Sequence, residues 1–190
     1  LGELNGATTG LRVRFSEFTN VGTPADLRTK TTVETLAGTG VAGGSDGFAA
    51  NATFSNPYGV VVAADGSIYV ADGTNHLIRE IKNGLVSTLA GNSTKGQTDG
   101  SGTAATFNFP FGIAINPVDD ALIVTDFSQN QIRRVTREGE VTTIAGTGAA
   151  GDTAGSGAVA TFRNPGGVAV DSDGTIYVAE ANRIRKIVLT

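Results

Sequence analysis

The sequence predicts an all-β fold in which one module of about fifty residues occurs three times. The evidence is a six-residue segment that recurs at nearly equal intervals. Residues 33–38, 86–91 and 141–146 read Val-Glu-Thr-Leu-Ala-Gly, Val-Ser-Thr-Leu-Ala-Gly and Val-Thr-Thr-Ile-Ala-Gly. The second copy begins 53 residues after the first, and the third 55 residues after the second. A fixed period of this length is typical of a propeller or a solenoid.

The composition narrows the class of protein. The 190 residues include 27 glycines and no cysteine, methionine or tryptophan, so disulfides and thiol chemistry are excluded. Fourteen Lys and Arg residues against 18 Asp and Glu give a net charge of −4, which disfavours a nucleic acid, including RNA, as partner. No apolar run reaches the roughly 18 residues of a membrane span. From the Gly-, Thr- and Ala-rich, Lys-poor composition we expect a secreted or cell-surface protein.

The first complete module contains four expected strands. They cover residues 59–63, 67–72, 77–82 and 86–90. Residues 59–63 are apolar on both faces, which is typical of a fully buried strand. Asn83-Gly84 is a strong hairpin signal between the last two strands. Because charge begins to alternate with apolar residues only in the later strands, we expect the first strand at a crowded hub and the last at a solvated rim.

The second and third modules repeat this order, and the third is incomplete. The strands expected in the second are 112–115, 121–124, 131–135 and 141–144, and those in the third are 167–170, 175–178 and 183–187. The third module therefore lacks its fourth strand, whereas residues 33–37 form a fourth strand without the three that precede it. We expect blades at about 57–91, 110–146 and 165–190, within a repeat region that covers residues 33–190.

Residues 1–32 do not match the module. Alternating residues at 11–15 are typical of a strand, and residues 20–30 resemble a loop. This segment is interpreted as a remnant blade, a linker or an arm that pairs with a neighbouring chain.

The third module resembles the NHL-repeat family. Residues 165–180 read Pro-Gly-Gly-Val-Ala-Val-Asp-Ser-Asp-Gly-Thr-Ile-Tyr-Val-Ala-Glu. Units of that family carry Pro-x-Gly-Val-Ala-Val-Asp-x-x-Gly-x-Ile-Tyr-Val-Ala-Asp, followed by a strand with Asn-x-x-Ile-Arg-Lys. Glu180 replaces the final Asp, which the other two copies keep as Asp72 and Asp126. The resemblance covers residues 33–190 and implies four-stranded blades, usually six to a ring. Family members include both enzymes and binding surfaces.

Three blades supply half of such a ring and leave two ends open. Each end would expose about 600 Å² of largely apolar surface, worth on the order of 15 kcal/mol, and free strand edges invite pairing with other chains. We therefore expect a second copy to complete the third blade. The strand supplied is Val33, Glu34, Thr35, Leu36 and Ala37, and the strand receiving it is Arg183, Ile184, Arg185, Lys186 and Ile187. Reciprocal exchange closes a ring and head-to-tail exchange gives a fibre. The alternative is that missing blades of the same chain complete the ring.

The glycine-rich linkers contain patterns that resemble ligand motifs. Residues 38–43 and 146–151 fit G-x-G-x-x-G, but dinucleotide binding also needs a helix directly afterwards, and Gly, Ser, Asp and Thr follow instead. Asp46-Gly47 and Asp99-Gly100 recur in the linkers and are interpreted as turns, with Ca²⁺ loops as the alternative. The third copy has Ala154 there. No cofactor is predicted.

An acidic residue and an arginine also recur in every blade. Asp72, Asp126 and Glu180 are each followed on the next strand by Arg79, Arg133 and Arg185. Because the pair recurs in all three copies, pairing within the sheet is favoured over a role as catalytic acids. The single histidine, His76, is predicted to be an exposed turn residue rather than a zinc ligand.

The hub mouth, where each first strand begins, is the remaining candidate site. We define it as residues 56–58, 109–111 and 164–166. It has no carboxylate or histidine, so Tyr58 and Phe111 are the candidate contacts for a small ligand. The predicted function is a non-catalytic binding or assembly module. The alternative is part of a propeller enzyme of the lyase or lactonase type, with its catalytic groups outside this chain.

Overall fold

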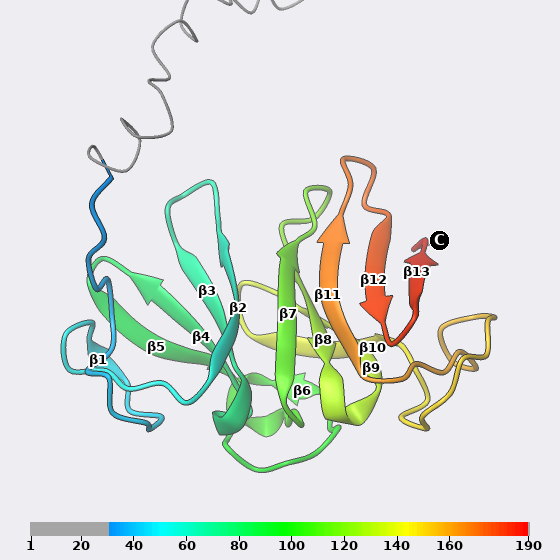
Figure 1. The fold of residues 1–190 in the computed structure, drawn as a ribbon, viewed down its shortest axis with the longest axis horizontal. Helices are drawn as coiled ribbons and strands as arrows, with labels where there is room; N and C mark the ends of the chain where they lie inside the picture. The colour runs from blue at the N-terminus through cyan, green and yellow to red at the C-terminus, as the bar shows by residue number, and fades with distance from the viewer. Residues whose placement is uncertain (1–30, 190) are drawn as a thin grey trace, which may run out of the picture. The chain divides into compact units, whose positions relative to one another are not determined.

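The computed structural model describes residues 31–189, and contacts within the chain divide it into two units at Thr35/Leu36. The described part of the first unit, residues 31–35, is exposed and contains no strand. The interpretations of residues 1–30 lie outside the described residues. The second unit, residues 36–190, contains three antiparallel sheets (Figure 1). The predicted all-β fold is confirmed.

The first two sheets are complete blades of the predicted kind. The first consists of β2 (Pro57–Val62), β3 (Ile68–Asp72), β4 (Leu77–Lys82) and β5 (Leu85–Ala90), and the second of β7 (Pro110–Ile115), β8 (Leu122–Asp126), β9 (Gln131–Val135) and β10 (Glu140–Ala145). Each carries one short further strand outside its fourth, β1 (Gly47–Phe48) beside β5 and β6 (Gly100–Ser101) beside β10. Two residues are too few to show a period, so these edge strands could not be predicted.

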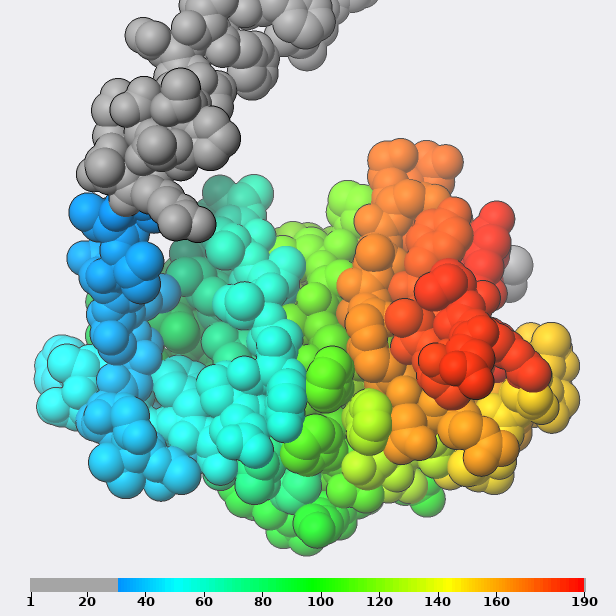
Figure 2. Space-filling model, in the orientation of Figure 1, coloured from blue at the N-terminus to red at the C-terminus, as the bar shows by residue number. Residues whose placement is uncertain are grey.

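The third sheet has three strands among the described residues. They are β11 (Pro165–Val170), β12 (Ile176–Glu180) and β13 (Arg183–Ile187), in that order. One edge of β13 is therefore unpaired within the part of the chain that the structure describes. This blade forms one end of the second unit, shown in orange and red in Figure 2.

The first strands of the blades pack against one another through glycine. A Cβ atom on Gly59 would lie 2.5 Å from the backbone oxygen of Phe111, and one on Gly112 would clash with the backbone oxygen of Gly166. Only glycine permits backbones to approach this closely. β2, β7 and β11 consequently lie side by side at the hub (Figure 1).

The burial of the strands differs from the predicted gradient. The most buried strand is the second of each complete blade, since every residue of β8 and four of the five in β3 are buried. β2, which was expected to be fully buried, has four exposed residues of six. The expectation was wrong for β2 because it has a neighbouring hub strand on one side only, whereas β7, which contacts both β2 and β11, has no exposed residue.

The core lies mainly between blades. Phe107 is fully buried between the first and second blades, and Phe162 is almost fully buried between the second and third. Phe54, at the same position of the first blade, is only partly buried. These aromatic rings act as the wedges that hold adjacent sheets together.

Candidate functional site

Each blade contains an arginine that joins its third strand to its second, buried in the two complete blades and partly exposed in the third. The Arg Nη1 atom lies 2.8 Å from Asp72 in the first blade, 3.1 Å from Asp126 in the second and 2.6 Å from Glu180 in the third. The guanidinium groups of Arg79, Arg133 and Arg185 also lie 4.9–5.2 Å from the ring centres of Phe54, Phe107 and Phe162. The pairing predicted from the sequence is confirmed, and these acids hold the blade together.

A second carboxylate in each complete blade fixes the fourth strand. Asp46 lies 2.6 Å from Arg79 and accepts hydrogen bonds from the Thr88 backbone N (3.0 Å) and Oγ1 (3.1 Å). Asp99 accepts the corresponding bonds from Thr143, at 3.0 and 2.9 Å. Burial opposes ionisation of Asp99, but the bonds from Thr143 and the ion pair with Arg133 outweigh it and lower its pKa. Asp46 and Asp99 thus have a structural role that the sequence interpretation missed.

Among the described residues, the third blade lacks both the second carboxylate and the fourth strand. Ala154 stands at the position of Asp46 and Asp99, and the Nη2 atom of Arg185 bonds only to the backbone oxygen of Thr153, at 3.0 Å. Where the sister blades hold β5 and β10, the third blade has a cavity of about 500 Å³. We call this cavity the rim groove.

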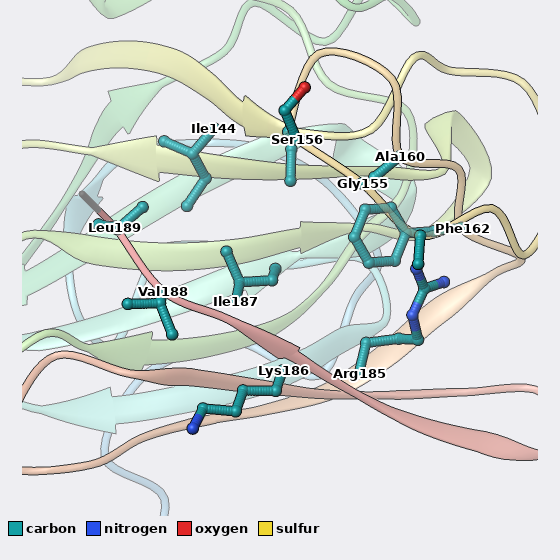
Figure 3. Close-up of a pocket in the computed structure, with 13 residues that line it drawn as sticks. Ile144, Gly155, Ser156, Ala160, Phe162, Arg185, Lys186, Ile187, Val188 and Leu189 are labelled. Atoms are coloured by element: carbon teal, nitrogen blue, oxygen red, sulfur yellow. The ribbon is translucent and has the colours of Figure 1, made fainter.

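The rim groove lies between the free side of β13 and the linker before β11. It is lined by Ile144 and Ala145 of β10, the linker residues 154–157, Ala160, Phe162 and residues 185–189. Figure 3 shows Ile144, Ile187 and Leu189 around this space, with Ser156 at one side. The strand side of the lining carries the charged residues Arg185 and Lys186 followed by apolar residues 187–189, and the linker side is rich in backbone groups. A strand edge of mixed polarity with free backbone groups is expected for a site that receives a β-strand.

Matched positions show what the open end leaves uncovered. Ile78 and Ile132, the first isoleucines of β4 and β9, are 0% exposed, but the equivalent Ile184 of β13 is 71% exposed. At the other end, Val86 and Val141 are buried, whereas the equivalent Val33 is 95% exposed. Ile132 is covered by the third blade, so Ile184 is the position that a following blade would cover. Val33 is the position that a fourth strand buries against its own blade.

The segment predicted to pair with another chain forms no strand within the described residues. Val33 to Ala37 are without strand structure, and Leu36 is 60% exposed. The residue that follows nevertheless adopts the conformation found after a fourth strand. Gly38 has φ 104°, close to the 97° of Gly91 and the 102° of Gly146. Its backbone N bonds to the Ala49 oxygen at 2.8 Å, as the N of Gly91 does to Gly102 at 3.1 Å.

The structure brings the two predicted hub-mouth residues into direct contact. Tyr58 and Phe111 stack with ring centres 4.6 Å apart and an interplanar angle of 22°. Phe109 lies 5.2 Å from Tyr58, and Phe127 lies 5.5 Å from Phe111. We call these four residues the aromatic cluster. Tyr58 is 47% exposed, so the cluster has a face open to solvent.

Two members of the aromatic cluster were not predicted as ligand contacts, although Phe109 lies within the predicted hub mouth and the sequence carries a signal for both. Phe109 has φ 68°, a left-handed conformation that asparagine tolerates far better than phenylalanine. The first and third blades have Asn56 and Asn164 at that position. Phe127 likewise stands where the first blade has Gly73. Departures from the repeat, rather than the repeat itself, mark this site.

The prediction for His76 was wrong. Its exposed fraction is 7%, and its Nδ1 accepts a hydrogen bond of 3.0 Å from the backbone N of Phe109. Burial lowers its pKa, and the charge of Lys95 adds to this effect. His76 is therefore held neutral and supports the loop that carries Phe109, because the next blade covers a turn that looked exposed in isolation.

Residues 31–189 contain no group of three or more His, Cys, Asp or Glu side chains that could hold a metal ion. The described residues also contain no helix long and apolar enough to cross a membrane.

Comparisons with known proteins agree with this architecture. Residues 32–158 match the profile of the teneurin NHL domain, and residues 162–185 match the NHL repeat. Similar curated proteins include Protein SUPPRESSOR OF QUENCHING 1, chloroplastic, of Arabidopsis thaliana (33% identical over 77% of this chain and 15% of that protein). Others are NHL repeat-containing protein 2 of Bos taurus (32%, over 69% and 20%) and human Teneurin-4 (31%, over 76% and 6%). The chain spans a fifth or less of the length of these relatives.

Solved structures with the same fold include two from Bacteroides. An auxiliary nutrient binding protein from Bacteroides ovatus is 26% identical with a TM-score of 0.63, over 73% of this chain and 38% of that one. A protein of unknown function from Bacteroides thetaiotaomicron is 28% identical with a TM-score of 0.63, over 68% of this chain and 34% of that one. Both are more than twice as long as the region they share with this chain.

Proposed function

Because this chain belongs to the NHL-repeat family, we propose that it is a non-catalytic β-propeller module for binding and assembly, in an exported or cell-surface protein. Strand exchange with another chain completes its ring or links successive chains into a fibre. One observation carries the proposal. The third blade has an open rim groove where its sister blades have a fourth strand, and a fourth-strand sequence without a blade lies at residues 33–37.

Strand addition fits the chemistry of the rim groove. A free strand edge presents a row of backbone N–H and C=O groups, and an added strand gains affinity through backbone hydrogen bonds and specificity through alternate side chains. The apolar side chains of Ile144 and Ile187 line this groove, and Ile184 lies exposed on the same strand. The groove therefore offers both parts of such an interaction.

The recurrent acids support a non-catalytic role. Asp72 and Asp126 are fully buried, and each accepts bonds from an arginine and from a backbone N–H. A carboxylate held in this way stabilises the sheet and has no access to a substrate. Turnover of a lactone or of a peptide-lyase substrate by the purified chain, or a stoichiometric metal in it, would overturn this part of the proposal.

Sedimentation of the purified chain over a wide range of concentrations tests the assembly. We expect the mass to rise from that of one chain, 19.3 kDa, to a defined dimer or to larger species as the concentration increases. A folded chain that stays monomeric at every concentration would contradict strand exchange.

The aromatic cluster favours a second role, which is binding of a small neutral ligand with a flat apolar face. Stacked aromatic side chains with one exposed face suit such ligands, and one protein of similar fold is an auxiliary nutrient binding protein. Because the chain has no tryptophan, tyrosine emission can follow titrations with neutral sugars and aromatic compounds.

The matched variants for this titration are Tyr58→Ala and Tyr177→Phe. We expect the first to abolish binding and the second to leave it unchanged, since Tyr177 lies on β12, outside the aromatic cluster. Binding that survives Tyr58→Ala would place the ligand elsewhere.

A further inference from the structure

The sister blades define how a fourth strand must lie in the rim groove. In the first blade, β5 places Ala90 opposite Ile78, Thr88 opposite Arg79, Ser87 opposite Glu80 and Val86 opposite Ile81. In the second blade, β10 places Ala145, Thr143, Thr142 and Val141 opposite Ile132, Arg133, Arg134 and Val135. The register is the same in both blades. It therefore serves as a template for the third.

We propose that the occupant of the rim groove is residues 33–37 of a second copy of this chain, in that same register. Ala37 then lies opposite Ile184, Thr35 opposite Arg185, Glu34 opposite Lys186 and Val33 opposite Ile187. This inference rests on the proposed strand exchange and adds to it the identity of the partner and the alignment of the two strands.

Charge complementarity supports this register. It places the carboxylate of Glu34 directly opposite the ammonium group of Lys186. In the complete blades the corresponding pairs are Glu80 with Ser87 and Arg134 with Thr142, which carry one charge each. Both Glu34 and Lys186 are exposed and form no ion pair among the described residues. Opposite charges directly across an antiparallel pair stabilise it, and like charges destabilise it.

The exposed apolar side chains fit the same arrangement. Val33 occupies the position of Val86 and Val141, which are buried against their own blades. Ile184 occupies the position of two fully buried isoleucines. Those isoleucines are covered by the next blade of the array. A strand in the proposed register therefore buries Val33, and the first blade of the same partner chain, which follows that strand, covers Ile184.

Gly38 provides an independent argument. A Cβ atom on Gly91 would lie 2.5 Å from the backbone oxygen of His76, and one on Gly146 would lie 2.5 Å from that of Asn130. Glycine is required there because the end of the fourth strand passes close to the turn before the third strand. Gly38 has the same left-handed conformation, yet the described residues near it are only the ring atoms of Phe54, at 3.3 Å or more. In the proposed dimer the missing turn is supplied by the partner, between β12 and β13.

Ala154 makes the third blade a weaker receptor than its sisters. Without a carboxylate at this position, Thr35 has no equivalent of the bonds that Thr88 and Thr143 make to Asp46 and Asp99. The exchanged strand is thus held by the backbone ladder, the apolar contacts and the pair Glu34–Lys186. A removable strand of this kind suits reversible assembly between copies.

Exchange of the two charges tests the register. The variants are Glu34→Lys, Lys186→Glu and the double variant that carries both changes. All three alter exposed side chains, so each is expected to fold. We expect each single change to raise the dissociation constant of a closed dimer on the order of tenfold, since the pair occurs twice. The double variant should return to within about threefold of the wild type.

Cross-linking provides a second measurement, which a cysteine-free chain makes simple. Separately purified Glu34→Cys and Lys186→Cys chains are mixed and oxidised. Residues directly opposite in an antiparallel pair have Cα atoms about 4.5–5.5 Å apart, within the range of a disulfide. The matched control mixes Glu34→Cys with Arg183→Cys, which is displaced by about 10 Å along the strand. We expect a covalent dimer from the first mixture and little from the second.

The outcomes separate this inference from the proposed function. A wild-type chain that is monomeric at all concentrations overturns both. A wild-type chain that assembles, with single charge variants that assemble equally well and with the control pair cross-linking as readily as the matched pair, leaves strand exchange standing and overturns this partner and register.

Discussion

The second and third blades have nearly the same sequence pattern but very different surroundings. Ile132 and Arg133 of β9 are completely buried, whereas Ile184 is exposed and Arg185 is partly exposed on β13. The local sequence, Ile-Arg-Arg against Ile-Arg-Lys, does not account for this difference. The neighbours do, because the second blade has a fourth strand and a blade on each side. In a repeat array each module is stabilised largely by the modules next to it.

The largest effect is expected from the buried arginines. Arg133→Met leaves Asp126 buried without a cation, and loss of one partner of a buried ion pair costs about 3–5 kcal/mol of unfolding free energy. Arg185→Met should cost less than half as much, because Arg185 is partly exposed and has no second carboxylate beside it. Chemical denaturation of both variants measures the difference. Equal losses would show that the open end does not weaken the third blade.

The paired isoleucines sharpen the same comparison. Ile132→Ala opens a cavity in a closed core and should cost about 2–5 kcal/mol. Ile184→Ala removes an exposed side chain, so the monomer should lose less than about 0.5 kcal/mol. In sedimentation, by contrast, Ile184→Ala should weaken assembly, since the chain that supplies the strand also brings its first blade over this residue, as the third blade covers Ile132. Loss of monomer stability equal to that of Ile132→Ala would mean that Ile184 is already covered.

Ala154→Asp converts the third blade toward its sisters. The new carboxylate lies beside Arg185. It can accept from Thr35 of the exchanged strand the two hydrogen bonds that Thr88 and Thr143 donate to Asp46 and Asp99 in the complete blades. We expect assembly to be strengthened by about 1–2 kcal/mol, typical of hydrogen bonds to a charged group. Ala154→Leu is the control for bulk alone. Assembly unchanged by the aspartate would show that Thr35 does not reach this position.

A further effect depends on pH and concerns the acid in the closed second blade. Burial raises the pKa of Asp126 to about 6, although the bonds from Asn108 and Arg133 favour its charged form. Between about pH 4 and pH 6 the folded chain therefore holds a proton that the unfolded chain has lost. Asp126 therefore makes the free energy of unfolding fall as the pH rises through that window. Above about pH 6 it no longer changes the pH dependence of that free energy.

The first blade suggests a variant that changes this titration. Asn75 donates a further bond of 2.8 Å to Asp72, whereas Gln129 at the same turn position bonds to Gln97. Gln129→Asn should supply the missing donor and lower the pKa of Asp126 from about 6, as measured by NMR titration of its carboxyl carbon. An unchanged midpoint would show that the amide does not reach Asp126.

Much of the hub mouth and of the pairing within blades could be predicted because it follows the repeat. Recurrence of Asp72 and Arg79 in register indicated a structural pair, and the alignment of Tyr58 with Phe111 placed both at the start of a hub strand. Phe109 and Phe127 were missed because they depart from the pattern, and their contacts arise only where two loops meet. His76 was missed because the blade that covers it lies about thirty residues further along the chain.

The sequence by itself determined the module, its recurrence and the main strands within each copy. These features follow from periodicity, which is a property of neighbours along the chain. Only the tertiary structure decided which equivalent residues are buried, that Asp46 and Asp99 fasten the fourth strand, and that a groove remains open beside β13. Those properties depend on segments far apart in the sequence, and their physical cause is the burial and hydrogen bonding that adjacent blades provide to one another.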